Sequence, residues 1–123
     1  MFDANLMLRS TSDGAMVVAS SPYTGAAVDY GEADTKPLTY IVRSPAVSGT
    51  TPTLDVKLQC STNGTTGWRD FAFFGRMTAA GFQNVTVRCQ ERYRRYYATL
   101  TGTLADFGAV EIGADVAGAN RGY

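Results

Sequence analysis

The sequence predicts an all-β protein: an antiparallel two-sheet β-sandwich that is jelly-roll-like and has eight or nine short strands. In the segment TLDVKLQC, residues 53–60, every second side chain is apolar, as in a strand with one buried and one solvent-facing side. Similar segments recur about every ten residues, separated by Gly, Pro, Asn and Ser, which is typical of sandwiches. No long segment repeats its apolar residues with the 3.6-residue period of a helix.

The first third of the chain predicts short elements. Residues 5–9 form a brief apolar run that fits either a strand or a docking arm, and residues 15–19 form a second run after the turn signal SDG. Residues 26–30 predict another short strand. The polar segment that follows ends at Pro37 and therefore predicts a connection.

The rest of the chain predicts clearer strands. Residues 38–43 are rich in β-branched and aromatic side chains, which favour strands. Residues 53–61 and 68–74 flank an Asn-Gly pair, which favours a hairpin because both residues accept positive φ. Residues 75–83 predict an irregular connection. Alternation then predicts three more strands, at 84–90, 94–101 and 107–113.

Size and charge limit the possible functions. The 123 residues predict one β-sandwich domain over 1–123, with 1–9 as a possible docking arm and 114–123 as a Gly-rich C-terminal tail. Eleven basic residues balance eleven acidic ones, which argues against a nucleic-acid partner because such binding needs excess positive charge. No apolar run reaches the ~18 residues of a membrane span. The chain also has no pattern of a secretory signal, so we expect no membrane partner and synthesis in a cytoplasm.

The sequence predicts that the protein is not an enzyme. Serine and cysteine nucleophiles usually need a histidine base, and the chain has no histidine. Cys60 and Cys89 are too few for a four-ligand zinc site, so we expect reduced core thiols rather than a metal or redox pair. Asp55 and Asp70 are candidate glycosidase carboxylates, but both alternate outward and nothing marks a shared cleft. We therefore expect no catalytic residue, no cofactor and no metal.

A cluster of arginine and tyrosine occupies residues 88–97, with four arginines and three tyrosines. In the predicted strand, Tyr96 points inward while Arg95 and Tyr97 point outward. Both residue types are favoured at protein interfaces, so a protein-binding surface is the preferred interpretation. A plain solvated hairpin and a stacking patch for nucleic acid are the alternatives.

Several segments resemble the capsid cement (staple, or decoration) proteins of short-tailed bacteriophages. The resemblance covers most of the chain and lies in strand and turn patterns, in residues 1–8, 28–31, 37–42, 53–59, 61–68 and 95–103. It implies a jelly roll on the outer capsid surface of the virion, made in the host cytoplasm, that binds the major capsid protein and stabilises the shell. It also implies a homo-oligomer, with a dimer favoured, and no cofactor. The segment 91–95 is more basic than in the family.

Two contact regions for the capsid are expected. The first is an apolar arm, with Phe2, Leu6 and Leu8, that adds backbone pairing to a neighbouring strand. The second is the hairpin of residues 92–97, with the partner-binding candidates Arg92, Tyr93, Arg94, Arg95 and Tyr97.

The alternative function is a carbohydrate-binding β-sandwich module of a phage head or tail fibre. It needs aromatic rings on an open face, and Trp68, Tyr97 and Phe74 are the candidates. Phe71 and Phe73 share a face in an ideal strand and Phe74 is out of phase, so one of these phenylalanines is expected to be exposed and to contact a partner.

Overall fold

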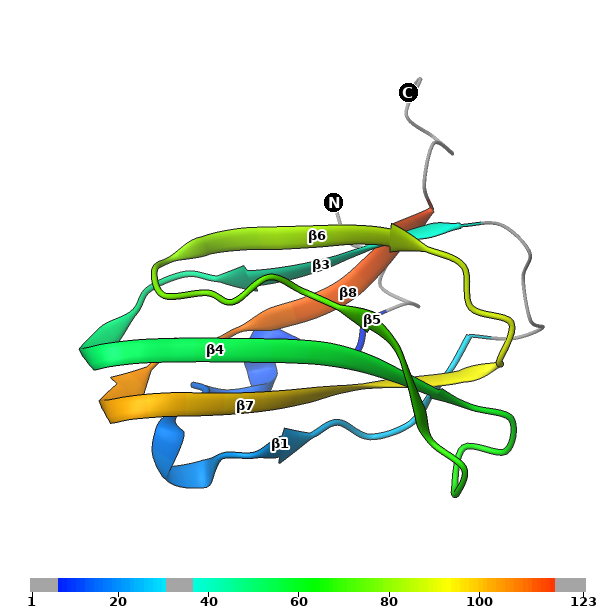
Figure 1. The fold of residues 1–123 in the computed structure, drawn as a ribbon, viewed down its shortest axis with the longest axis horizontal. Helices are drawn as coiled ribbons and strands as arrows, with labels where there is room; N and C mark the ends of the chain where they lie inside the picture. Colours follow the sequence, from blue (N-terminus) through cyan, green and yellow to red (C-terminus); the bar gives the residue numbers. More distant parts are fainter. Residues whose placement is uncertain (1–6, 31–36, 117–123) are drawn as a thin grey trace.

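The computed structural model describes residues 7–30 and 37–116, and its regular structure is almost entirely β (Figure 1). Two short 3-10 turns, η2 (Thr11–Asp13) and η3 (Val18–Ser20), precede the strands. The strands are β1 (Tyr23–Thr24), β2 (Val28–Asp29), β3 (Leu38–Ser44), β4 (Ser48–Ser61), β5 (Arg69–Phe73), β6 (Gly81–Val87), β7 (Tyr93–Asp106) and β8 (Glu111–Val116). The predicted all-β class is confirmed. The strands are not all short, because β4 and β7 have 14 residues each.

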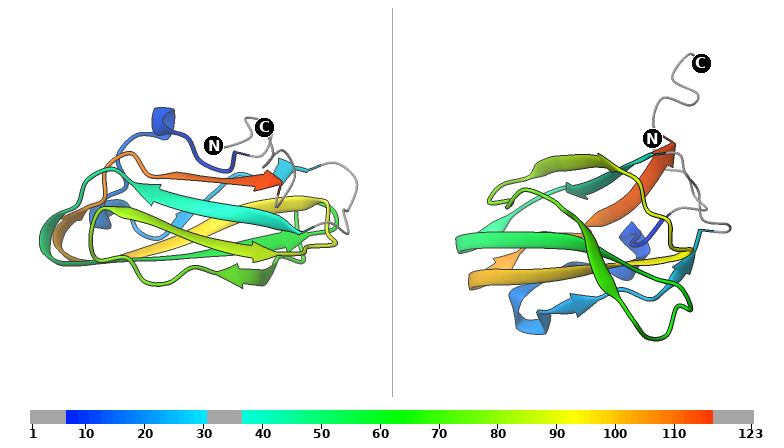
Figure 2. Two further views of the ribbon diagram at one scale, coloured as in Figure 1. Left: turned by 90° about the horizontal axis from the view of Figure 1, so that it is seen from above. Right: turned by 45° about the vertical axis from the view of Figure 1, so that its right-hand side comes forward.

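The strands form two antiparallel sheets that face each other (Figures 1 and 2). One sheet has the order β1–β7–β4–β5, and β2 also pairs with β7. The other sheet has the order β6–β3–β8. Every strand pair is antiparallel. The predicted two-sheet sandwich is therefore confirmed.

The N-terminal segment completes a jelly roll. The amides of Leu8 and Arg9 donate to the carbonyl of Ile112 at 2.8 and 2.9 Å, so this segment lies beside β8. If the segment counts as the first strand and β1 with β2 as the second, the strand orders are 1–8–3–6 and 2–7–4–5. This is the arrangement of the eight-stranded, double Greek-key jelly roll.

The core lies between the two sheets and is formed by every second residue of their strands. The alternation in residues 53–60 is confirmed, because Leu54, Val56, Leu58 and Cys60 are buried. Both cysteines are buried free thiols, as the sequence predicted. The largest apolar side chains that are fully buried are those of Met16, Tyr40, Val42, Leu54, Leu58, Phe107, Val110 and Ile112.

Some predicted element bounds were wrong. The apolar run at residues 15–19 contains one isolated bridge at Val17 and the start of η3. The predicted strand at 26–30 is limited to β2, and β6 begins inside the segment 75–83 that was predicted to be irregular. The predicted tail begins too early, because β8 continues to Val116 and Ala114 is buried. Residues 117–123 lie outside the described part of the chain.

Strand β5 contains a bulge that the sequence pattern did not predict. Leu58 pairs with Ala72 and Gln59 pairs with Asp70, so Phe71 is an extra residue between them. The extra residue reverses the alternation, so that Phe73 is exposed and Phe74 is buried. Phe71 packs against the core and meets the ring of Tyr40 edge-on at 5.5 Å between centroids.

The pairing of β4 with β7 is irregular over residues 48–53 of β4, and two glycines allow the backbones to approach closely there. Gly102 has a φ of 118°, and a Cβ atom there would lie 2.8 Å from the carbonyl oxygen of Thr51. Gly49 has a φ of 106°, and a Cβ atom there would lie 2.7 Å from the carbonyl oxygen of Leu104. The two strands therefore approach at this end more closely than side chains allow.

Within the described residues, no helix has the length and apolar character that crossing a bilayer requires.

Candidate functional site

The candidate site is the outer face of the β7–β4–β5 sheet, which we call the candidate face. It arises because residues that pair directly across antiparallel strands point to the same side of the sheet. In one row, Lys57 on β4 pairs with Tyr97 on β7 and with Phe73 on β5. In the next row, Gln59 on β4 pairs with Arg95 on β7 and with Asp70 on β5.

Hydrogen bonds connect the second row across all three strands. The Nε of Arg95 donates to Oε1 of Gln59 at 2.8 Å, and Nε2 of Gln59 donates to Oδ1 of Asp70 at 3.0 Å. Nζ of Lys57 donates to the other carboxylate oxygen of Asp70 at 3.1 Å, which joins the two rows. The hydrogen bond from Gln59, together with the charge and hydrogen bond of Lys57, lowers the pKa of Asp70. Asp70 is therefore ionised at neutral pH and holds both donors in place.

A cationic side chain lies over each of two aromatic rings of the candidate face. The guanidinium of Arg95 lies 4.2 Å from the centre of the Trp68 ring, and Nζ of Lys57 lies 5.1 Å from the centre of the Tyr97 ring. Both distances are within the range of cation–π attraction. Burial lowers the pKa of Arg95, but an arginine still stays charged at neutral pH. Hydrogen bonds and ring contacts therefore fix the orientation of these side chains within the chain itself.

One apolar side chain protrudes beside this network. Phe73 is 65% exposed and is one of three large apolar side chains that are exposed in the described residues, with Phe82 and Leu104. An open pocket of about 430 Å³ lies next to it, lined by Asp55, Val56, Lys57, Phe73, Phe74, Tyr97 and Thr99. Asp55 at its rim forms a two-bond ion pair with Arg76, at 3.0 and 2.9 Å. The candidate face thus combines an exposed phenylalanine, a shallow depression and ordered charges.

The structure brings some of the predicted contact residues to this face. Arg95 and Tyr97 belong to it, as the alternation predicted. Tyr93 is half-buried on the same side of β7, and Arg92 forms a two-bond ion pair with Asp29 at 2.6 and 2.8 Å. These residues lie on or beside the candidate face, but their role in binding stays a prediction.

Arg94 does not belong to a surface, and its assignment as a contact residue was wrong. Only 1% of it is exposed, because it shares the inward phase of Tyr96. Its Nη1 donates to the Tyr40 hydroxyl at 2.6 Å, and its Nη2 donates to the carbonyl oxygens of Cys89 and Glu91 at 3.0 and 3.1 Å. It is a structural residue that joins the two sheets and the β6–β7 connection.

The expected docking arm also needs correction. Leu8 is buried in the core of its own chain, and its backbone already pairs with β8. Arg9 is buried as well and donates from Nη1 to the carbonyl of Val110 at 2.7 Å. Leu8 is therefore not available to a partner in this fold. Phe2 and Leu6 lie outside the described residues.

The set of aromatic rings predicted for sugar stacking also needs correction. Phe74 is buried, and the exposed ring is that of Phe73. Sequence reasoning also missed Gln59 and Asp70 as members of the network. Their outward phase was visible in the alternation, but their partners depend on the register of three strands and on the β5 bulge.

Neither a family model nor a curated protein matches this chain.

Proposed function

We propose that the chain is a capsid cement protein, a structural virion protein that binds the outer surface of a phage head through the candidate face and bridges subunits of the major capsid protein. The observation that carries the proposal is the ordered network of Arg95, Gln59, Asp70 and Lys57 beside the exposed Phe73. Side chains that are already held in one geometry lose little entropy on binding. An aromatic anchor surrounded by ordered polar groups is the usual composition of a protein-binding surface.

Cement action also needs many copies that act together. Each copy of a small sandwich contacts only a modest area of a shell, so its individual affinity is limited. Opening the shell requires many such contacts to break, and a dimeric cement that holds two sites gains further from effective concentration. We therefore propose a homo-oligomer, with a dimer favoured, on the outer capsid surface. In this proposal the protein is not an enzyme and needs no cofactor, nucleic acid or membrane.

The experiment is a binding assay with expanded heads of the phage that encodes the chain, prepared without it. Sedimentation and counting of bound copies should give a plateau limited by sites. The F73A variant should bind at least about tenfold more weakly, because truncating an aromatic anchor costs ~1–2 kcal/mol or more.

The matched control is F82A. Phe82 is 64% exposed, almost the same as Phe73, but it lies on β6 in the other sheet. F82A should bind heads as the parent does. Equal binding by the parent and F73A, or no plateau, would remove the candidate face from consideration.

A carbohydrate-binding module of a phage head or tail fibre is the second candidate. The open pocket beside Phe73 favours it, since about 430 Å³ is within the range of small-ligand sites and Asp55 and Thr99 offer polar groups. Against it, Arg95 and Lys57 already occupy one face of the Trp68 and Tyr97 rings. If the chain binds a glycan and does not bind phage heads, this second function is favoured.

A further inference from the structure

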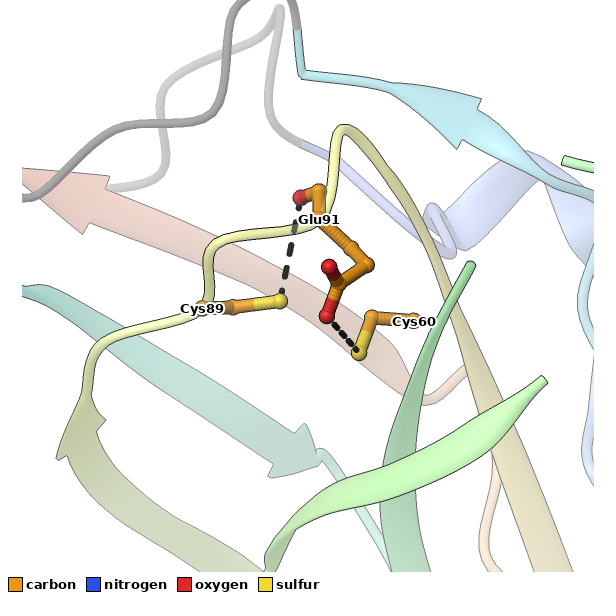
Figure 3. A group of neighbouring side chains, drawn as sticks. All are labelled: Cys60, Cys89 and Glu91. Atoms are coloured by element: carbon orange, nitrogen blue, oxygen red, sulfur yellow. Dashed lines mark hydrogen bonds between the residues drawn. The ribbon is translucent and has the colours of Figure 1, made fainter. Parts of the chain in front are cut away.

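Two buried thiols and one carboxylate converge at one end of the sandwich (Figure 3). Cys60 lies near the end of β4, Cys89 lies just beyond β6, and Glu91 lies in the connection from β6 to β7. The two sulfur atoms and a carboxylate oxygen of Glu91 all lie within 4.8 Å of one another. Sγ of Cys60 donates to Oε1 of Glu91 at 3.7 Å, and Sγ of Cys89 donates to the backbone carbonyl of Glu91, also at 3.7 Å.

These three groups are suitable ligands for a thiophilic divalent cation. Zinc binds cysteine sulfur at about 2.3 Å and carboxylate oxygen at about 2.0–2.2 Å, so ligand atoms around one tetrahedral ion lie roughly 3.5–3.8 Å apart. The present spacing therefore needs shifts of about 1 Å or less per atom to enclose an ion. The side chains come from two segments that are far apart in the sequence, the end of β4 and the β6–β7 connection, and they point to one place.

The surrounding charges fit an occupied site. Two thiolates and one carboxylate around a divalent cation leave a net charge of −1. The guanidinium of Arg94 supplies +1 from a fixed, buried position, because it donates to the backbone carbonyls of both Cys89 and Glu91. A buried charge is tolerated when an opposite charge with satisfied hydrogen bonds lies beside it.

Arg69 covers the carboxylate side of this group. It pairs with Oε1 of Glu91, and its side chain is 63% exposed. A long exposed side chain can turn into solvent at little cost, which would free the carboxylate oxygen and open a path to the thiols. Arg69 therefore competes with a cation for Glu91, whereas Arg94 remains in place.

We propose that Cys60, Cys89 and Glu91 form a zinc-class metal site, with water in the fourth position. Binding releases the two thiol protons to solvent and displaces Arg69 from Glu91. The ion ties the end of β4 in one sheet to the β6–β7 connection that leads from the other sheet. It acts as a structural clamp, and the inference does not depend on the proposed capsid function.

The test uses the full chain, purified with a reducing agent, and cobalt(II) as a spectroscopic probe, followed by zinc competition. One equivalent of cobalt should give a sulfur-to-cobalt charge-transfer band and a tetrahedral visible spectrum, and zinc should remove both. Zinc should also raise the melting temperature in a concentration-dependent way, as a ligand of the folded state does.

Four variants make the test specific. C89S should lose one thiolate contribution to the band, and E91Q should bind zinc more weakly. E111Q is the matched control, because Glu111 is also a half-buried carboxylate in an ion pair, with Arg43 at 3.0 Å, and it should bind as the parent does. R69Q should bind more tightly than the parent, because it removes the competing cation.

Two results would overturn the site. One is a reduced, folded chain that takes up no cobalt and whose melting temperature does not respond to zinc. The other is binding that persists unchanged in C89S and E91Q, which would locate the ion elsewhere.

Discussion

Arg94 provides the sharpest test of the fold, because the structure gives it a purely internal role. R94M keeps much of the aliphatic volume but removes the guanidinium. The change leaves the buried Tyr40 hydroxyl and the carbonyl of Cys89 without the donor that Arg94 supplies, and it leaves the carbonyl of Glu91 with only the weak Sγ donor of Cys89. A hydrogen bond to a charged group contributes ~1.5–3 kcal/mol, and an orphaned buried polar group costs ~1–3 kcal/mol.

The expected loss in the free energy of unfolding is therefore about 3–5 kcal/mol, allowing for some solvation of the two carbonyls. Urea titration followed by tryptophan fluorescence measures it, since the chain has one tryptophan. The control is R43M, because Arg43 is half-exposed in a surface ion pair, and its loss should cost at most about 1 kcal/mol.

A double-mutant cycle with Y40F tests the assigned partner. Y40F alone leaves one Arg94 donor unpaired, so the double variant should lose less than the sum of the two single losses. A loss for R94M no greater than for R43M, or additive losses in the cycle, would refute the assignment of Arg94 as a buried connection between the sheets.

Three further changes follow from the same structure. L8A should destabilise the fold by ~2–4 kcal/mol in the same titration, because Leu8 is in the core; a change confined to partner binding would contradict this. G102A should destabilise more than G67A, since both have positive φ but only at Gly102 would a Cβ atom meet backbone; equal losses would contradict the close approach. Burial raises the pKa of Tyr40, so the folded chain keeps this proton longer than the unfolded chain, and the free energy of unfolding should fall as pH rises above about 10. In Y40F the free energy of unfolding should fall less steeply with pH. An equally steep fall in Y40F and in the parent would contradict the burial of the Tyr40 hydroxyl.

The sequence allowed prediction of the sheet architecture because alternation is a local property of each strand. It predicted the inward side of β4 and the outward position of Arg95 and Tyr97. For Arg94, the residue type suggested the surface, but the alternation in β7 directs its side chain inward. The next residue on the same side, Tyr96, is buried, and so is Cys60, which pairs with Arg94 on β4. An arginine can occupy such a position when three acceptors lie within its reach.

Other features depend on contacts between distant segments, and local patterns do not encode them. The bulge at Phe71 inserts one residue into β5 and exchanges the positions of Phe73 and Phe74. The association of Glu91 with Cys60 and Cys89 follows from where the β6–β7 connection crosses the end of β4. A pairing map of the strands, rather than residue types alone, would have been needed to foresee both.

The bridge between Arg9 and β8 has a practical consequence for protein engineering. Because the chain enters and leaves the described fold along two adjacent, antiparallel backbone segments, Met7 lies close to the end of β8. A short linker there should yield a circular permutant with new termini in a surface turn. Both junction points lie in the sheet that contains β8, whereas Phe73 lies on the other sheet. A protein fused at this junction would therefore lie on the side of the sandwich opposite the candidate face.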